Sequence, residues 1–222
     1  MISVVIPAWN EERALPRTLA SVFAQAMPYQ VIVADGGSTD DTRSIAAADP
    51  RVSLVSAPKG RASQMNAGAR RARGDWILFL HADTRLPPGA LSAIAALPPR
   101  VAAGCFRHRF SGQDWRLALI SRLHDWRFSV TGIVYGDQAM FVRRTLFDGL
   151  GGFPEVSHLE DVLFSERLVR VTRPSMLDLT VETESRKFEQ MGIWKSLGRV
   201  LAILACHQLR LPLPTRFFRD VR

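Results

Sequence analysis

Short apolar runs alternate with segments of helical period through the first hundred residues of the chain. The runs are ISVVIP at 2–7, QVIVAD at 30–35, VSLVSA at 52–57 and DWILFLHAD at 75–83. Continuous apolar runs of this length are typical of strands buried on both faces, with crossover helices between them. The pattern predicts an α/β fold whose central sheet is mostly parallel and flanked by helices.

The segments between these runs carry the spacing expected of helices. Residues 11–26 repeat apolar positions such as Leu15 and Leu19 at helical intervals. The other two helices are expected at 41–48 and 63–73.

The pattern changes after Pro98 and Pro99, which mark a seam. No Gly/Ser or charged run accompanies the two prolines, so the seam is not a linker. Beyond it, strands are expected at 103–110 and 138–142, and helices at 115–128, 160–170 and 193–209. The last helix is amphipathic, carries Lys195 and Arg199, and precedes a basic tail that Pro residues interrupt.

Polar segments follow each strand of the first half: PAWNEE, DGGSTDD, APKGRASQMNAG and HADT, in chain order. Open α/β sheets bind ligands outside the carboxyl ends of their strands. We therefore expect the carboxylates in such positions to converge in one cleft. They are Glu11, Asp35, Asp83 and the pair Glu160 and Asp161.

Composition excludes several classes of protein. The 222 residues are 47% hydrophobic and 23% charged, so disorder, collagen and coiled coil are poor interpretations. Cys105 and Cys206 have no CxxC partner, which leaves no disulfide framework and no thiolate zinc site, and both are expected as small apolar fillers. The start of the chain lacks a secretory pattern, and no apolar run reaches the ~20 residues of a membrane span. A cytoplasmic protein without a transmembrane helix is expected.

The net charge is +8, and half of the excess lies in residues 182–222. Phosphate-bearing ligands, anionic lipid surfaces and nucleic acid all suit such a basic chain. Composition does not choose among them.

No P-loop, dinucleotide-binding, zincin or hydrolase-elbow motif is present. Asp35 ends a strand before two glycines, where it either accepts hydrogen bonds from a ribose or base, or forms a turn. Ser38 and Asp41 have the spacing of a capping box, so Ser38, Asp40 and Asp41 are interpreted as helix-cap residues.

Asp83 follows the strand WILFL and offers a hard oxygen for Mg²⁺ or Mn²⁺ on a diphosphate, or else it caps the next turn. His81 would tilt the preference toward Mn²⁺, although we interpret it as a substrate-contacting or supporting residue. Glu160 and Asp161 begin a helix, where they either favour its N-terminus or supply a general base.

Five cations surround the third strand and the helix after it. Lys59 and Arg61 lie in the loop, where they can meet a pyrophosphate. Arg70, Arg71 and Arg73 are interpreted as solvated.

Several ordered segments together resemble the family 2 glycosyltransferases, which have the GT-A fold. They are IPAWNEE, VADGGSTDDT, NAGARRARGDWILFLHADT, GGFPE with LEDVLFSERL, and SRKFE. With HAD and YGDQ, the chain is similar to the short bacterial subgroup called selenodomain-associated transferase 2. The resemblance implies one GT-A domain over 1–190, with a Rossmann-like nucleotide-sugar-binding half (1–98) and an acceptor half (99–190), followed by the helix and tail at 191–222.

The resemblance implies transfer of a sugar, with inversion, from a UDP- or GDP-linked donor to a hydroxyl acceptor, which includes lipid-linked acceptors. A divalent cation, Mn²⁺ or Mg²⁺, would neutralise charge on the departing diphosphate while a carboxylate deprotonates the hydroxyl.

Site roles follow position by position. Together with the loop analysis, the resemblance places Pro7, Ala8, Asn10, Glu11, Asp35, Lys59, Arg61, Asn66, Gly68, His81, Ala82 and Arg186 on the donor side. Asp83 would hold the metal, Asp161 would act as the base with Glu160 beside it, and Gly136, Asp137 and Gln138 would face the acceptor.

The chain departs from the family pattern at two places. The usual acidic pair at the metal reads HAD, so His81 replaces the first carboxylate and metal affinity or preference is expected to change. A metal-independent reaction would rely on Lys59, Arg61 and Arg186 for charge stabilisation. The late basic motif that contains Arg186 ends in Phe188 instead of Trp.

Two other classes stay open. A nucleotidyltransferase would need a Gly-rich basic loop after the first strand, where PAWNEE has none. A non-catalytic module for membrane surfaces or nucleic acid would use the basic C-terminus. Residues 193–222 either rest on anionic lipid at the inner membrane face or present the solvated face of a packed helix. We expect no nucleic-acid partner, and the sequence leaves the oligomeric state open.

Overall fold

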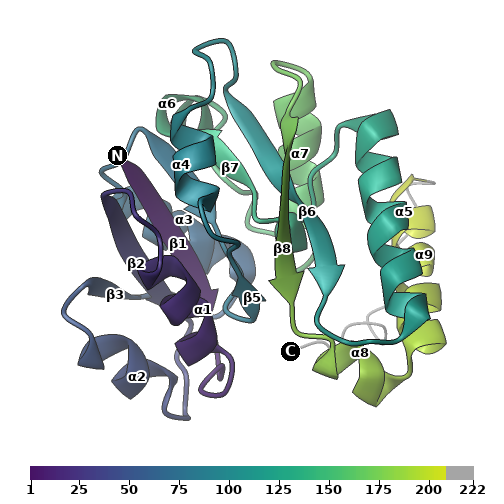
Figure 1. Ribbon diagram of the computed structural model, residues 1–222, viewed down its shortest axis with the longest axis horizontal. Coiled ribbons are helices and arrows are strands. Elements are labelled where there is room, and N and C mark those ends of the chain that lie inside the picture. The colour runs from purple at the N-terminus through teal and green to yellow at the C-terminus, as the bar shows by residue number, and fades with distance from the viewer. Residues whose placement is uncertain (209–222) are drawn as a thin grey trace.

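One mixed sheet of eight strands runs through the molecule, with helices on both sides (Figure 1). The computed structural model describes residues 1–208, apart from the side chains of residues 187, 188, 199, 200 and 203–208. The strand order is β3-β2-β1-β4-β7-β6-β8-β5. The strands are β1 (Ile2–Ala8), β2 (Tyr29–Asp35), β3 (Val52–Ser56), β4 (Trp76–Phe79), β5 (Thr84–Arg85), β6 (Ala103–Phe110), β7 (Phe141–Arg143) and β8 (Ser175–Thr183).

Helices separate these strands in the chain. They are α1 (Leu15–Phe23), α2 (Thr42–Ala48), α3 (Arg61–Arg71), α4 (Ala90–Ala95), α5 (Trp115–Thr131), α6 (Arg144–Gly149), α7 (Glu160–Val169), α8 (Arg186–Met191) and α9 (Ile193–Gln208), with a 3₁₀ turn η1 (Gly136–Gln138). In Figure 1, α1 and α4 lie in front of the sheet, α3 and α7 lie behind it, and α5 runs beside α9 at one end.

The predicted α/β class is confirmed. Strands β1 to β4 form the parallel half of the sheet, in which Ala8 of β1 stands level with Asp35 of β2, and Asp35 with Ser56 of β3. Strand β7 enters antiparallel to β4 and joins it to the later strands, so one sheet continues across the seam at Pro98 and Pro99. Because β1, β2 and β3 end level and β4 runs parallel to them, the loops after these strands share one edge of the sheet.

Alternating residues of β1 bury on opposite faces of the sheet. Ile2, Val4 and Ile6 belong to the core on the α1 and α4 side, whereas Val5 belongs to the core on the α3 side. A strand covered on both faces has no polar face to alternate with, which explains the continuous apolar run in the sequence.

A cluster of four phenylalanine rings anchors α7 behind the sheet. Phe164 of α7 is fully buried, with its ring centroid 4.8 Å from that of Phe153 and 5.2 Å from that of Phe147. Phe79 of β4 lies 4.8 Å from Phe153, centroid to centroid. Truncating such a buried ring typically costs about 3–5 kcal/mol, so this packing holds the start of α7 in place relative to the sheet.

Several predicted boundaries were wrong. The helix expected at 11–26 is shorter, and the strand expected at 138–142 begins at Phe141 because η1 occupies the residues before it. The capping box does not form. The Ser38 hydroxyl accepts from the Asn10 N–H, and Asp41, at the N-cap of α2, makes no side-chain bond to the helix backbone. The Asp40 carboxylate accepts from the Thr42 N–H at 3.0 Å instead.

Six elements were not predicted at all: β5, α4, η1, α6, the long strand β8 and α8. The helix expected at 193–209 corresponds to α9, whereas the basic tail beyond residue 208 lies outside the described residues. Among the described residues, no helix combines the length and the apolar character needed to cross a bilayer.

Replacing Gly68 with alanine should lower the free energy of unfolding by roughly 1–3 kcal/mol, the usual cost of overpacking a core. An added Cβ would stand 2.3 Å from Cγ1 of Val5, a β-branched side chain with little freedom to move. Urea denaturation measures the change. In α9, an added Cβ at Gly198 meets nothing within 4 Å, so Gly198→Ala should be neutral or stabilising. Equal effects of the two substitutions would contradict the close packing of α3 on β1.

Candidate active site

The carboxyl ends of β1 and β2 carry two loops that are joined to each other by hydrogen bonds. Asn10 adopts a left-handed conformation (φ 55°), and its Oδ1 accepts from the Thr39 N–H at 2.9 Å. The Glu11 N–H donates to Thr42 Oγ1 at 2.7 Å. The predicted donor residues Asn10 and Glu11 therefore stand directly against the loop after β2.

Asp35 is fully buried at the end of β2 and organises this second loop. Its carboxylate accepts from the Gly37 and Ser38 N–H groups and from Arg43 Nη1 at 2.6 Å. Burial raises the pKa of Asp35, but the hydrogen bonds from Ser38, Arg43 and Gly37 outweigh it and hold that pKa below the ordinary 3.8. In the structure Asp35 therefore forms the turn after β2, as one of its two interpretations proposed. Its contact with a base or ribose stays a prediction.

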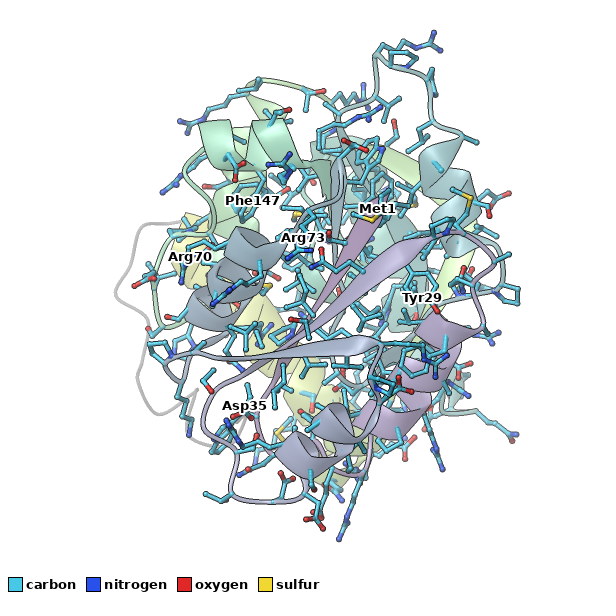
Figure 2. The ribbon with its side chains drawn as sticks, turned by 90° about the vertical axis from the view of Figure 1, so that its left-hand side faces the viewer. Met1, Tyr29, Asp35, Arg70, Arg73 and Phe147 are labelled. Atoms are coloured by element: carbon cyan, nitrogen blue, oxygen red, sulfur yellow. The ribbon has the colours of Figure 1, made fainter. Side chains whose placement is uncertain are left out.

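Figure 2 separates two ends of the sheet. Asp35 lies at the opposite end of β2 from Tyr29, and Arg70 and Arg73 lie away from Asp35. Arg70, Arg71 and Arg73 are exposed, as expected.

Gln64, which the sequence analysis missed, ties the ends of β1 and β2 together. Its Nε2 donates to the Ala8 carbonyl at 2.6 Å and to the Ala34 carbonyl at 3.1 Å, and the side chain is buried. Pro7 and Ala8 lie within β1 at this point. The backbone at the predicted donor edge is thus braced from α3.

Lys59 and Arg61 lie on the same edge. Lys59 Nζ lies 3.3 Å from the ring centroid of Trp9 in a cation–π contact. The sequence analysis did not predict this contact. Arg61 begins α3, and its Nε lies 3.1 Å from Oε1 of Glu160 in α7. This ion pair joins the two halves of the chain.

His81 and Asp83 follow β4. The Asp83 carbonyl accepts from the Glu184 N–H at 3.0 Å, and the Ala82 carbonyl accepts from Thr18 Oγ1 at 2.7 Å, so the loop is fixed from both sides. His81 Nε2 is buried and has no hydrogen-bond partner among the described residues.

The charges of Asp83, Asp137 and Asp161 act on both His81 and Arg61. Burial and the nearby Arg61 lower the pKa of His81 despite these three carboxylates. Burial alone would lower the pKa of Arg61, but Glu160 and the same three carboxylates raise it. The sequence placed these residues on different loops, and the structure brings them into one electrostatic environment.

Asp161 is held by two backbone groups. Its Oδ2 accepts from the Gly136 N–H at 2.7 Å, and its Oδ1 accepts from the Val162 N–H at 2.8 Å. A Cβ at Gly136 would lie 2.6 Å from His81 Nε2 and 3.2 Å from Asp161 Oδ2, so only glycine allows the three segments to meet this closely. Asp161 is 8% exposed.

The other two residues of η1 turn toward α5. Asp137 Oδ2 lies 3.5 Å from His124 Nδ1 and 3.9 Å from His108 Nε2, and these histidines hold the pKa of Asp137 at about 2 against the effect of burial. Gln138 is fully buried, and its Oε1 accepts from the Tyr135 N–H and from Arg127. The sequence analysis did not single out either histidine, because they lie on different elements that only the fold brings together.

Three predicted donor residues make contacts of another kind. The Asn66 side chain donates to the Phe153 carbonyl and accepts from the Phe153 N–H, at 2.8 and 3.0 Å. Gly68 packs against Val5. Arg186 lies 4.0 Å from Glu184 and is 41% exposed. The structure does not join these residues to the group around His81, and their donor roles stay predictions.

The half-parallel sheet and the loops at its edge define an α/β protein of the GT-A type, and comparison with known proteins places it in a family. A family model described as glycosyl transferase family 2 matches residues 3–146. The chain belongs to this family of glycosyltransferases, which confirms the resemblance and replaces the nucleotidyltransferase and non-catalytic alternatives.

Relatives named undecaprenyl-phosphate 4-deoxy-4-formamido-L-arabinose transferase are similar over 95% of this chain. The protein from Pseudomonas fluorescens SBW25 is 30% identical and that from Serratia proteamaculans 568 is 27% identical, with 66% and 69% of their lengths covered. A Pectobacterium carotovorum relative of the same name is 37% identical over 39% of this chain and 30% of its own. The aligned regions therefore cover between 30% and 69% of the lengths of these relatives.

Solved structures share the fold. TarS from S. aureus in complex with UDP-GlcNAc has a TM-score of 0.66 at 21% identity, covering 82% of this chain and 58% of that one. A mannosyltransferase from Pyrobaculum calidifontis in complex with GDP-Man and Mn²⁺ has a TM-score of 0.60 at 22% identity, covering 82% and 56%.

Asp35→Asn should destabilise the protein at neutral pH by about 1.5–3 kcal/mol, the usual worth of hydrogen bonds to a charged group. Because the pKa of Asp35 is lowered in the folded state, its contribution is present above its ordinary value of 3.8 and is lost as pH falls through the folded value. The difference in unfolding free energy between wild type and variant should therefore shrink in acid, as denaturation at several pH values measures. A pH-independent difference would contradict this, and exposed Asp148→Asn serves as the control.

Proposed function

We propose that this chain transfers a sugar, with inversion, from a nucleoside-diphosphate sugar to an acceptor hydroxyl, with Asp161 as general base. The observation that carries the proposal is the convergence of Asp161, Gly136 and His81, with the charges of Arg61 and Asp83 acting on the same group. In this proposal residues 1–98 bind the donor and residues 99–190 receive the acceptor.

The carboxylate of Asp161 is oriented as a base needs to be. Two N–H groups fix its oxygens, and a carboxylate has further lone pairs with which to accept a hydroxyl proton. A positioned base of this kind typically contributes ~10²–10⁴-fold to a rate. Glu160 beside it is paired with Arg61, which supports Asp161 as the base of the pair.

The residues at Asp83 fit a divalent cation that is shared with the substrate. Asp83 supplies one hard carboxylate oxygen, and the buried Nε2 of neighbouring His81 is compatible with Mn²⁺. Among the described residues, the three-residue cluster with metal-ligand spacing does not include Asp83, so the protein alone builds no closed cage there. When bound, such a cation neutralises charge on the leaving diphosphate. Arg61 and Lys59 add positive charge at the same edge.

A second acceptor class has its own support. The relatives are named as transferases of undecaprenyl phosphate, whose nucleophile would be a phosphate oxygen. Such an oxygen is ionised at neutral pH and needs no base. A lipid-borne acceptor also agrees with a protein that works peripherally at the inner membrane face, and the exposed Trp115 and Trp194, 6.3 Å apart between ring centroids, would suit that surface.

Asp83→Asn should abolish a Mn²⁺-dependent thermal stabilisation by the donor nucleotide. The measurement is the melting temperature with UDP, GDP and their sugar conjugates, with and without Mn²⁺, because a ligand that binds the folded state raises it. One nucleotide should stabilise wild type and the exposed control variant Glu155→Gln. An equal shift in Asp83→Asn, or one that needs no cation, would overturn the assignment of Asp83.

Asp161→Asn should lower kcat by ~10²–10⁴-fold with hydroxyl acceptors while the donor affinity stays unchanged. The readout is release of the nucleoside diphosphate with polyprenyl-linked hydroxyl acceptors and, in parallel, with polyprenyl phosphate. If the wild type transfers sugar to polyprenyl phosphate and Asp161→Asn does so at the same rate, the acceptor is a phosphate and the hydroxyl proposal is wrong.

A further inference from the structure

Three side chains from separate elements meet between β6, α5 and η1. They are His108 of β6, His124 of α5 and Asp137 of η1, and we call them the histidine cluster. One ligand atom from each lies within 4.8 Å of the other two. Asp137 Oδ2 is 3.5 Å from His124 Nδ1 and 3.9 Å from His108 Nε2. The cluster is separate from the cation position proposed at Asp83.

His108 is buried, His124 and Asp137 are partly buried, and several buried polar atoms of the three side chains lack hydrogen-bond partners among the described residues. The His108 side chain is fully buried, and neither ring nitrogen has a hydrogen-bond partner among the described residues. The same holds for His124 Nδ1 and for Asp137 Oδ1. A buried polar atom without a partner costs about 1–3 kcal/mol, so several of them together indicate a ligand that satisfies them at once.

The distances suit a small cation. Metal–ligand bonds of about 2.0–2.1 Å in a tetrahedral site put ligand atoms roughly 3.3–3.5 Å apart, so the cluster needs only a modest contraction to close around an ion. Packing already restrains the rings, since His108 stands edge-on to Phe110 with a centroid separation of 4.6 Å. Two imidazoles with one carboxylate favour Zn²⁺ and similar transition metals over Mg²⁺ or Ca²⁺.

We propose that His108 Nε2, His124 Nδ1 and Asp137 Oδ2 bind a Zn²⁺-class transition metal ion, separate from the donor cation. Three protein ligands leave the fourth position to a water or another small ligand. The ion fastens β6, α5 and η1 to one another.

The site has a consequence for Asp161. Asp137 directly follows Gly136, whose N–H donates to Asp161 Oδ2. Metal binding at Asp137 therefore holds the peptide that orients the carboxylate, and Asp137 acts as a positioning residue in this role.

The test uses the full chain, stripped with a chelator and then dialysed against Zn²⁺ in the presence of excess Mg²⁺. Bound zinc is measured after gel filtration. Wild type should retain one Zn²⁺ per chain. Two variants each remove one proposed ligand: Asp137→Asn, which keeps the shape of the side chain, and His124→Gln. Loss of a residue that only supports a metal ligand weakens metal binding by ~10–100-fold, so loss of a ligand itself should weaken zinc binding by more than that.

Two control variants separate this site from others. His158→Gln removes a histidine outside the cluster, and Asp83→Asn removes the proposed donor ligand, so both should keep the zinc. Circular dichroism confirms that each variant is folded. Wild type without zinc, or cluster variants that bind as much as wild type, would overturn the proposal. Neither result depends on nucleotide binding, so the zinc site and the proposed transfer reaction can fail independently.

Discussion

The hydrogen bond from the Gly136 N–H to Asp161 Oδ2 is the contact on which the arrangement of the site depends. It joins η1 to the start of α7, and His81 from the loop after β4 packs against the same glycine. Any side chain at this position would displace either the His81 imidazole or the Asp161 carboxylate, so only glycine fits where the three segments meet. The loop after β4, η1 and the carboxylate of Asp161 are brought together at this point.

Charge balance imposes a second constraint on the same place. Glu160 is buried, and its pairing with Arg61 spans from α7 to α3. The Arg61 side chain is 47% exposed, so the costly change is loss of Arg61, which removes a cation from the buried Glu160 carboxylate. The ion pair therefore resists separation of the two halves, while the phenylalanine cluster around Phe164 supplies the apolar part of the same contact. Packing sets the position of α7, and the pairing with Arg61 distinguishes Glu160 from the neighbouring Asp161.

The expectations that succeeded rest on local patterns. Continuous apolar runs are needed wherever a strand is covered on both faces, so β1 to β4 and their parallel arrangement could be predicted from the sequence. Polar residues after each strand predicted Asp35 and Asp83 at one edge. Long-range pairing decided part of what failed. Strand β8 does carry a local signal, since apolar Leu177, Leu179 and Val181 alternate with polar residues, and the sequence analysis missed it. The expected bond between Ser38 and α2, in contrast, was lost to the Asn10 N–H from another loop.

The sequence by itself determined the fold class, the edge of the sheet that carries the polar loops, and the residues of the family motifs, because each of these depends on neighbours in the chain. The tertiary structure decided how those residues are used. It turned Asn66 toward the Phe153 backbone, paired Arg61 with Glu160, and gathered His108, His124 and Asp137 from three elements. The spacing of residues along the chain does not predict such contacts. Residues far apart in the sequence come into contact only because the sheet and helices pack in one particular arrangement.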